Sequence, residues 1–290
     1  MQNKITSIHL QQVKLQFRTA GREDVVMGNK GLGWTFDTVA SAYEKFRPGY
    51  TDGLYKMIFD YIMLDNSCYA VEIGIGGGQA TLPFLKMGCN LTAVEPGRHF
   101  SALCKEKFKE YYNFNIVTNK FEDMDFPDDT YDLVYSASAF HWIPEGTGYT
   151  KVFSMLKSGG AFARFANHPY CSKDNVPLSE EIDKIYGEYY YKFYNRKQEV
   201  MEEYDGEQAV QRARIAEKYG FMDIKYALFH RTRTFSAKEY SALLGTYSDH
   251  IAVEEGIRKA FFSKIEDAVN NHGGSITLYD TIDLQLARKP

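Results

Sequence analysis

The sequence contains few cysteines, and their positions exclude two kinds of site. Four of the 290 residues are cysteine: Cys68, Cys89, Cys104 and Cys171. They form neither a Cys-x-x-Cys pair nor a group with histidine at metal-ligand spacing. Structural zinc sites and redox dithiols both need such spacing. The sequence therefore predicts no metal site, and free thiols are typical of an intracellular protein, which we expect to be cytoplasmic.

Long apolar runs and an excess of positive charge are also missing. Residues 1–30 carry charges throughout, and no later stretch has the length and composition of a membrane span. The formal net charge is -4, so no overall positive field is available to bind a phosphate backbone. We therefore expect neither a membrane nor a nucleic acid as partner, and a small molecule as substrate.

Apolar runs alternate with helical stretches in the first half of the chain. Five runs are strand candidates: Tyr69 to Ile73, Leu91 to Val94, Asn115 to Val117, Tyr131 to Ser136 and Ala161 to Phe165. Between them lie helical patterns such as RHFSALCKEKFKEYY and YTKVFSMLK. This alternation predicts a parallel sheet covered on both faces, in which ligands bind at the carboxyl ends of the strands.

The remaining segments frame this sheet. Residues 1–35 predict a polar arm, and residues 36–290 predict a single domain that begins with a lid helix over 36–50. A charged, tyrosine-rich sequence predicts a helical cap inserted at about 170–220, over the ligand edge of the sheet. Strand patterns return in IKYALFHRTRTF and in SITLYDTIDLQLAR.

A glycine-rich turn follows the first strand, in YAVEIGIGGGQATLPF. A P-loop would need lysine after its last glycine, but Gln79 follows Gly78. A dinucleotide fingerprint needs a small residue where Gln79 stands. The spacing is instead Glu-x-Gly-x-Gly-x-Gly, made by Glu72, Gly74, Gly76 and Gly78. Because the acidic residue repels a pyrophosphate and attracts an ammonium group, the turn indicates a cofactor that carries an amino acid.

This turn and three later segments resemble, in order, the class I S-adenosylmethionine-dependent methyltransferases. VEIGIGGGQAT is similar to the first motif of that family, LTAVEPG to its second strand, and TNKFEDMDFPDDTYDLVYSASAFHW to the next two segments. The resemblance implies an α/β fold with a doubly wound, mostly parallel seven-stranded sheet of the Rossmann-like methyltransferase type and a helical cap. It also implies S-adenosylmethionine as the cofactor.

The resemblance further implies which residues hold the cofactor. Glu72 and the three glycines would lie at its amino-acid part, and Glu95, followed by Pro96, would bind the ribose diol. Phe121 and Glu122 would frame the adenine, and Ser136 and Ala137 would lie beside the methionine portion. Lys120 departs from the wider family, where an acidic residue is common, so the adenine contact moves to Glu122 or to backbone groups.

Two segments, ASAYEKFRPGY and SASAFHW, look most like the small-molecule branch that includes trans-aconitate methyltransferase. In that branch the N-terminal helix closes over the cofactor, and Tyr43 and Arg47 hold the matching places. The resemblance implies that Tyr43 covers the sulfonium end and that Arg47 pairs with the carboxylate of the cofactor.

Candidates for the acceptor side follow the fourth strand and lie in a later one. His141 is either a general base or hydrogen-bond orienter, or a loop histidine that caps the next helix. Trp142 beside it is a candidate substrate contact. In HRTRTF, alternation places Arg231 and Arg233 on one face, which suits a carboxylate substrate if that face lines the cleft and is otherwise a solvated edge.

Together these features predict methyl transfer from S-adenosylmethionine to a small molecule, with a carboxylic acid as one candidate acceptor. Two alternatives stay open. A methyltransferase acting on RNA or another nucleic acid would need a local basic groove, and a non-catalytic S-adenosylmethionine-binding protein would keep the fold without turnover.

Overall fold

The structure, a computed structural model, describes residue 43 and residues 46–171, 173–199 and 201–290. Within these residues one sheet has seven strands in the order β3-β2-β1-β4-β5-β7-β6. The strands are β1 (Tyr69–Ile73), β2 (Asn90–Val94), β3 (Phe114–Val117), β4 (Tyr131–Ala137), β5 (Leu156–Tyr170), β6 (Met222–Ser236) and β7 (Ser275–Arg288). β1 to β5 run parallel, and β7 is antiparallel to both neighbours. The predicted doubly wound, mostly parallel sheet is confirmed.

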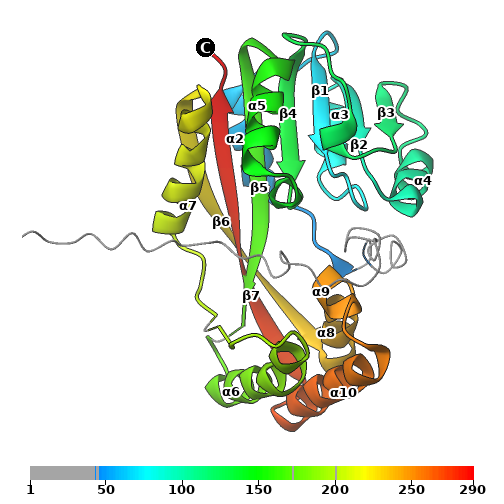
Figure 1. Cartoon of the computed structure of the whole chain (residues 1–290), viewed down its shortest axis with the longest axis vertical. Helices are drawn as coiled ribbons and strands as arrows, with labels where there is room; N and C mark the ends of the chain where they lie inside the picture. Colours follow the sequence, from blue (N-terminus) through cyan, green and yellow to red (C-terminus); the bar gives the residue numbers. More distant parts are fainter. Residues whose placement is uncertain (1–42, 44–45, 172, 200) are drawn as a thin grey trace, which may run out of the picture.

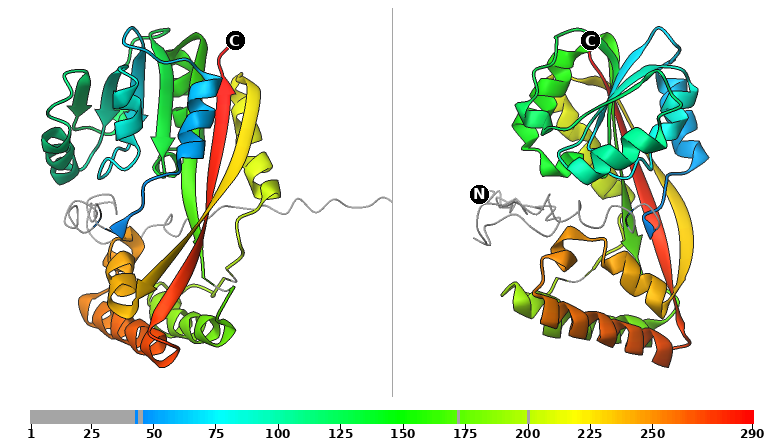
Figure 2. Two further views of the ribbon diagram at one scale, coloured as in Figure 1. Left: turned by 180° about the vertical axis from the view of Figure 1, so that it is seen from behind. Right: turned by 90° about the vertical axis from the view of Figure 1, so that its right-hand side faces the viewer.

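Helices cover both faces of the sheet, as Figure 2 shows in its right-hand view. Alternate side chains of a strand point to opposite faces. Ala70 of β1 therefore packs in the core under α2 (Asp52–Tyr61), α3 (Thr81–Lys86) and α4 (Arg98–Lys107). Val71 and Ile73 pack in the opposite core, against α5 (Glu145–Met155). Two short 3-10 helices, η3 (Phe121–Asp123) and η4 (Phe140–Trp142), follow β3 and β4.

Three strands continue far beyond this layered part. β5, β6 and β7 have 15, 15 and 14 residues, whereas β1 has 5. Their extensions form a ribbon that leads to a second group of helices, seen at the bottom of Figure 1. These helices are α6 (Val176–Ile185), the π-helix η5 (Tyr186–Tyr191), α8 (Ala237–Leu244), α9 (Ser248–Ile251) and α10 (Glu255–Asn271). We call this group the helical module; it has a core of its own, centred on Phe261 and Ile265.

The segment at about 170–220, predicted as one cap, is divided between two places. α6 and η5 belong to the helical module, whereas α7 (Gly206–Ala213) packs on β6 and β7, and η6 (Arg214–Tyr219) contacts α5 and β6. The fifth strand, predicted at Ala161 to Phe165, is also longer than expected and extends over Leu156–Tyr170. Residues up to Tyr170 instead pair with β7. An apolar pattern shows that a helix forms but not which surface it packs on.

The expected arm at 1–35 and most of the lid helix at 36–50 lie outside the described residues. Tyr43 and Phe46 are helical, and residues 47–50 then cross between the sheet and the helical module (Figure 1). Within the described part of the chain, no helix has both the length and the apolar character needed to cross a membrane.

Candidate active site

The glycine turn between β1 and α3 has a backbone shape that needs glycine. Gly74, Gly76 and Gly78 have φ values of +72°, +54° and +73°, in the left-handed region. A Cβ added at Gly74 would lie 2.4 Å from the Cβ of Ala139, and one at Gly78 would lie 2.7 Å from the ring of Phe108. The turn is therefore held between the chain that leaves β4 and the end of α4.

Glu95 ends β2 and faces this turn. Its Oε2 accepts a hydrogen bond from the backbone N–H of Gly76 at 3.0 Å, and its Oε1 accepts one from the N–H of Gly97 at 2.9 Å. The residue is 7% exposed, while the neighbouring Pro96 is exposed. A carboxylate at this position is the type of acceptor that a ribose diol needs, and that contact of Glu95 stays a prediction.

Glu72 lies beneath the turn rather than at its open side. It is fully buried, and its Oε2 accepts hydrogen bonds from Thr81 Oγ1 and from the Tyr135 hydroxyl, both at 2.8 Å. Burial raises the pKa of Glu72 to about 8, against the hydrogen bonds from Thr81 and Tyr135 that lower it. Glu72 thus packs in the core against β4 and α3, and its contact with the ammonium group of the cofactor stays a prediction.

The two residues predicted to frame the adenine lie in η3. Phe121 is buried, with its ring centroid 5.5 Å from that of Phe126, and Glu122 is half-buried. Lys151 of α5 fixes η3, since its Nζ donates to the backbone oxygens of Phe121 and Glu122 at 2.8 and 2.9 Å. The sequence contained no signal for Lys151, and the adenine contact itself stays a prediction.

Ser136 and Ala137 end β4 at the same edge of the sheet as Glu95. Ser136 is fully buried, and its hydroxyl donates to the backbone oxygen of Ile73 at 2.9 Å. Ala137 is half-buried. Ser136 therefore joins the ends of β1 and β4, and Ala137 is the residue of the pair nearer to the edge.

Tyr43 and Arg47 were predicted to close over the cofactor. Both belong to the lid segment (residue 43 and residues 46–50), and the guanidinium carbon of Arg47 lies 5.0 Å from the ring centroid of Tyr43. The Tyr43 ring lies 3.6 Å from the position of a Cβ at Gly76, so it covers the glycine turn. Arg47 instead donates from Nε to Thr246 Oγ1 at 3.0 Å, and its guanidinium carbon lies 3.9 Å from the ring centroid of Tyr247. Arg47 thus binds the α8–α9 connection of the helical module, and its pairing with a cofactor carboxylate stays a prediction.

His141 and Trp142 lie in η4, directly after the chain has passed the glycine turn. Both are half-buried, and their ring centroids are 5.0 Å apart. The preceding Phe140 packs in the core with Phe162 and Tyr149, which fixes η4 against the sheet. The two residues are therefore near the edge where the cofactor segments converge, and their roles stay predictions.

Arg231 and Arg233 lie on one face of β6, as the alternation predicted, and both bind Asp280 of β7. Arg233 donates from Nε and Nη2 to the two carboxylate oxygens at 2.6 and 2.9 Å, and Arg231 donates from Nε at 3.2 Å. Arg231 also reaches the backbone oxygen of Gly49 and the Oδ1 of Asn167. Asp280 is 1% exposed. Two guanidinium groups thus share one buried carboxylate, which leaves one net positive charge.

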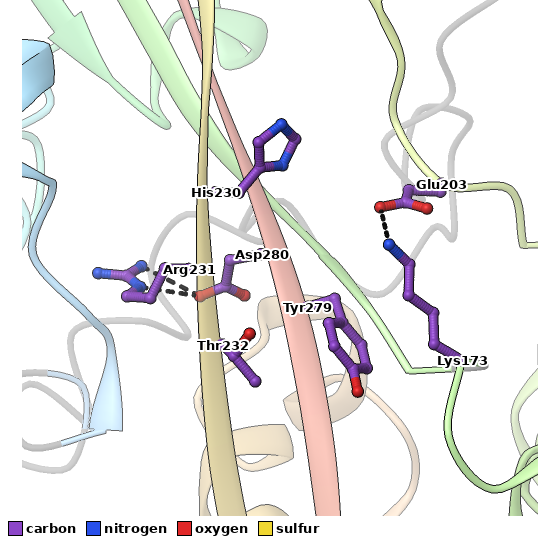
Figure 3. Close-up of a pocket in the computed structure, with 7 residues that line it drawn as sticks. All are labelled: Lys173, Glu203, His230, Arg231, Thr232, Tyr279 and Asp280. Carbon is purple, nitrogen blue, oxygen red and sulfur yellow. Dashed lines mark hydrogen bonds and ion pairs between the residues drawn. The ribbon is translucent and has the colours of Figure 1, made fainter.

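Figure 3 shows that Arg231 points toward the lid segment while Tyr279, Lys173 and Glu203 lie on the other side of the ribbon. A cavity of about 220 Å³ lies at this ribbon, and residues from both sides line it: Lys173, Glu203, His230, Arg231, Thr232, Tyr279 and Asp280. Lys173 and Glu203 pair with each other there at 2.6 Å. Arg231 and Asp280 therefore line this cavity, while the Arg231 side chain also reaches the lid segment. The described residues contain no cluster of His, Cys, Asp and Glu able to hold a metal ion.

Four further residues on the lid side were not predicted from the sequence: Tyr50, Ser138, Asn167 and Asp280. Asp280 stands directly opposite Arg231 in the strand register, so a known register would have revealed it. Tyr50 and Ser138 carried no signal of their own, because their contact joins residues 88 positions apart.

Comparisons with known proteins agree with this geometry. A family described as a methyltransferase domain matches residues 71–163, from β1 into β5. An uncharacterized methyltransferase of Bacillus cytotoxicus is 30% identical over 162 residues, which cover 52% of this chain and 74% of that protein. An uncharacterized methyltransferase-like protein of Schizosaccharomyces pombe is 25% identical over 217 residues, 74% of this chain and 77% of that protein.

Among solved structures, a candidate type II methyltransferase from Anaeromyxobacter dehalogenans matches with a TM-score of 0.57 and 17% identity, over 84% of this chain and 98% of that chain. A likeness at this level of identity concerns the fold and carries no information about the acceptor.

Proposed function

The chain belongs to the class I S-adenosylmethionine-dependent methyltransferases, and on that premise we propose that it methylates a small molecule that carries a carboxylate group. The observation that carries this proposal is the pair of arginines, Arg231 and Arg233, that share the buried Asp280 beside the lid segment. A site with one uncompensated positive charge favours an anionic ligand. The resemblance of the lid sequence to the trans-aconitate methyltransferase branch supports the same acceptor class.

The residues at the glycine turn fit S-adenosylmethionine. The carboxylate of Glu95 can accept hydrogen bonds from a ribose diol, and any Cβ at Gly76 would fill the space between the turn and Tyr43. When bound, the cofactor supplies a methyl carbon that accepts the acceptor's electron pair while the carbon–sulfur bond breaks and its electrons go to sulfur.

The protein's own task is to position the acceptor and exclude water. Arg233, whose side chain is 14% exposed, would bind the carboxylate of the acceptor. Tyr43 lies against the turn at Gly76. Holding two reactants in line is the main catalytic contribution that such a site needs, because the methyl group is already electrophilic.

The test is methyl transfer to matched pairs of small molecules. Each pair consists of a hydroxy acid and its amide, such as glycolate with glycolamide and 4-hydroxybenzoate with 4-hydroxybenzamide, so that both members keep a hydroxyl group. Product is detected as a mass gain of one methylene. We expect turnover of acids only. The variant Arg233→Gln should raise the KM of the acid by about tenfold or more while kcat changes less, because the lost contact is made in the bound substrate as well.

Lys225→Gln is the matched control, since Lys225 lies on the same strand with an exposed side chain. Equal turnover of acids and amides would contradict the carboxylate proposal. Salt-sensitive binding of RNA with methylation of RNA would indicate the nucleic-acid alternative, and cofactor binding without transfer to any acceptor would indicate a non-catalytic protein.

A further inference from the structure

Ser138 has a backbone conformation that residues other than glycine rarely adopt. It follows the last residue of β4, and its φ is +56°. Its backbone N–H donates to the oxygen of Phe165 on β5 at 2.8 Å, which holds the residue in place. Strained residues of this kind cluster at sites where a side chain must be directed to one position. What Ser138 contacts is therefore informative.

The Ser138 hydroxyl meets the Tyr50 hydroxyl at 2.9 Å. The backbone N–H of Asn167 donates to the same Oγ at 3.4 Å. Tyr50 packs edge-on against Phe165, with ring centroids 4.7 Å apart. Burial raises the pKa of Tyr50 well above its ordinary value, so the hydroxyl stays protonated and able to donate. Both residues keep part of their surface exposed.

This hydroxyl pair lies between the two halves of the candidate site. On one side, Ala139 packs directly on Gly74, so the chain after β4 touches the cofactor turn. On the other side, Arg231 binds both the backbone oxygen of Gly49 at 2.8 Å and the Oδ1 of Asn167 at 3.1 Å. The pair therefore adjoins the cofactor turn through Ala139 and the arginines through Asn167.

We propose that Tyr50 and Ser138 bind and orient the nucleophilic group of the methyl acceptor. This inference rests on the proposed function, in which Arg231 and Arg233 hold a carboxylate of the same molecule. The two hydroxyl groups are neutral and already share one hydrogen bond. Together they can donate one further hydrogen bond to, and accept one from, a substrate group that lies between the arginines and the glycine turn. They align the lone pair of that group without changing its charge.

The experiment compares Tyr50→Phe, Ser138→Gly and Ser138→Ala with the unchanged protein, using the acid of highest turnover in the panel above. We expect kcat to fall by about tenfold or more in Tyr50→Phe and Ser138→Gly, while the Kd of S-adenosylhomocysteine changes less than about twofold. Ser138→Gly removes the hydroxyl group, and glycine adopts the left-handed backbone conformation without strain. A loss of kcat in this variant is therefore an effect of the missing hydroxyl group and not of a changed backbone.

Tyr55→Phe is the matched control for Tyr50→Phe. Tyr55 is a buried tyrosine whose hydroxyl donates only to a backbone oxygen, that of Ala80 at 3.3 Å. We expect its kcat and KM to stay unchanged.

Three outcomes would overturn the inference. Unchanged kcat in both Tyr50→Phe and Ser138→Gly would contradict it and leave the methyltransferase proposal intact. Full activity in Ser138→Gly with loss in Ser138→Ala would show that only the backbone conformation matters. Absence of methyl transfer to every acid by the unchanged protein would contradict the proposed function itself, and the inference with it.

Discussion

At the scale of single residues, Glu72 and Glu95 both stand near the end of a strand but differ in their hydrogen-bond partners. Glu95 is bound by two backbone N–H groups at the edge of the sheet, whereas Glu72 is buried with Thr81 and Tyr135. The motif spacing located both residues, because glycine and acidic positions are set by the turn. It did not reveal which way Glu72 points, since that depends on Tyr135 from a strand 63 positions later.

Glu72→Gln should change how stability depends on pH. The pKa of Glu72 is raised by burial from the ordinary 4.5 to about 8 in the folded chain. The stabilising effect of the neutral carboxyl group is therefore full below about pH 4.5 and is lost as the pH rises through 8. Glutamine stays neutral, so we expect the variant to gain stability relative to the unchanged protein between pH 4.5 and 8.5, measured by urea unfolding.

The control for this experiment is Glu106→Gln, on α4, where the side chain is 73% exposed. An exposed carboxylate contributes little to stability, so its variant should follow the pH curve of the unchanged protein. A curve for Glu72→Gln that also runs parallel to that of the unchanged protein would show that Glu72 is ionised in the fold.

At the scale of elements, the strands of the layered sheet were predictable and the ribbon was not. Short apolar runs bounded by polar residues located β1 to β4 to within one residue at each end. The length of β5 was missed because Asn167, His168 and Pro169 are polar or turn-forming residues. They remain in a strand because β7 pairs with them and Asp283 accepts a hydrogen bond from His168.

The contact between the glycine turn and the chain after β4 gives a prediction about Gly74. In Gly74→Ala, the alanine would have to adopt a left-handed backbone conformation, at φ +72°. Its Cβ would also lie 2.4 Å from the Cβ of Ala139. We expect a loss of about 3 kcal/mol in the free energy of unfolding, from the backbone conformation and from overpacking together. Urea unfolding measures this loss.

Gly159→Ala separates the two causes. Gly159 has a similar φ of +81°, but an added Cβ would meet nothing within 4 Å. We expect this variant to lose only about 1 kcal/mol. Equal losses in the two variants would mean that the chain after β4 does not press on the turn, and that Ser138 and Tyr50 lie farther from the cofactor site than the structure shows.

At the scale of the whole molecule, the candidate site is assembled from parts that are distant in sequence. The layered sheet supplies the glycine turn and Glu95, and the ribbon supplies Arg231, Arg233 and Asp280. The lid segment joins them, because Gly49 binds Arg231 while Arg47 binds Thr246 of the helical module. Local patterns indicate the candidate cofactor half, since the residues predicted for it follow strand ends in order.

The acceptor half could not be located from the sequence in the same way. Its contacts depend on the register of β6 with β7 and on a lid segment that meets residues from about 88 to 199 positions away. Long-range contacts of this kind leave no periodic pattern in either segment. The two arginines were found only because alternation along one strand placed them on the same face.

The most direct test of the whole account is calorimetric titration of the protein with S-adenosylhomocysteine, with NADH titrated in parallel. The account predicts saturable binding of S-adenosylhomocysteine, no binding of NADH, and a roughly 10- to 100-fold weaker affinity in Glu95→Ala, because a charged hydrogen-bond acceptor for the ribose is lost. Binding of NADH without binding of S-adenosylhomocysteine would contradict the assignment of the glycine turn, and the proposed methyl transfer would fall with it.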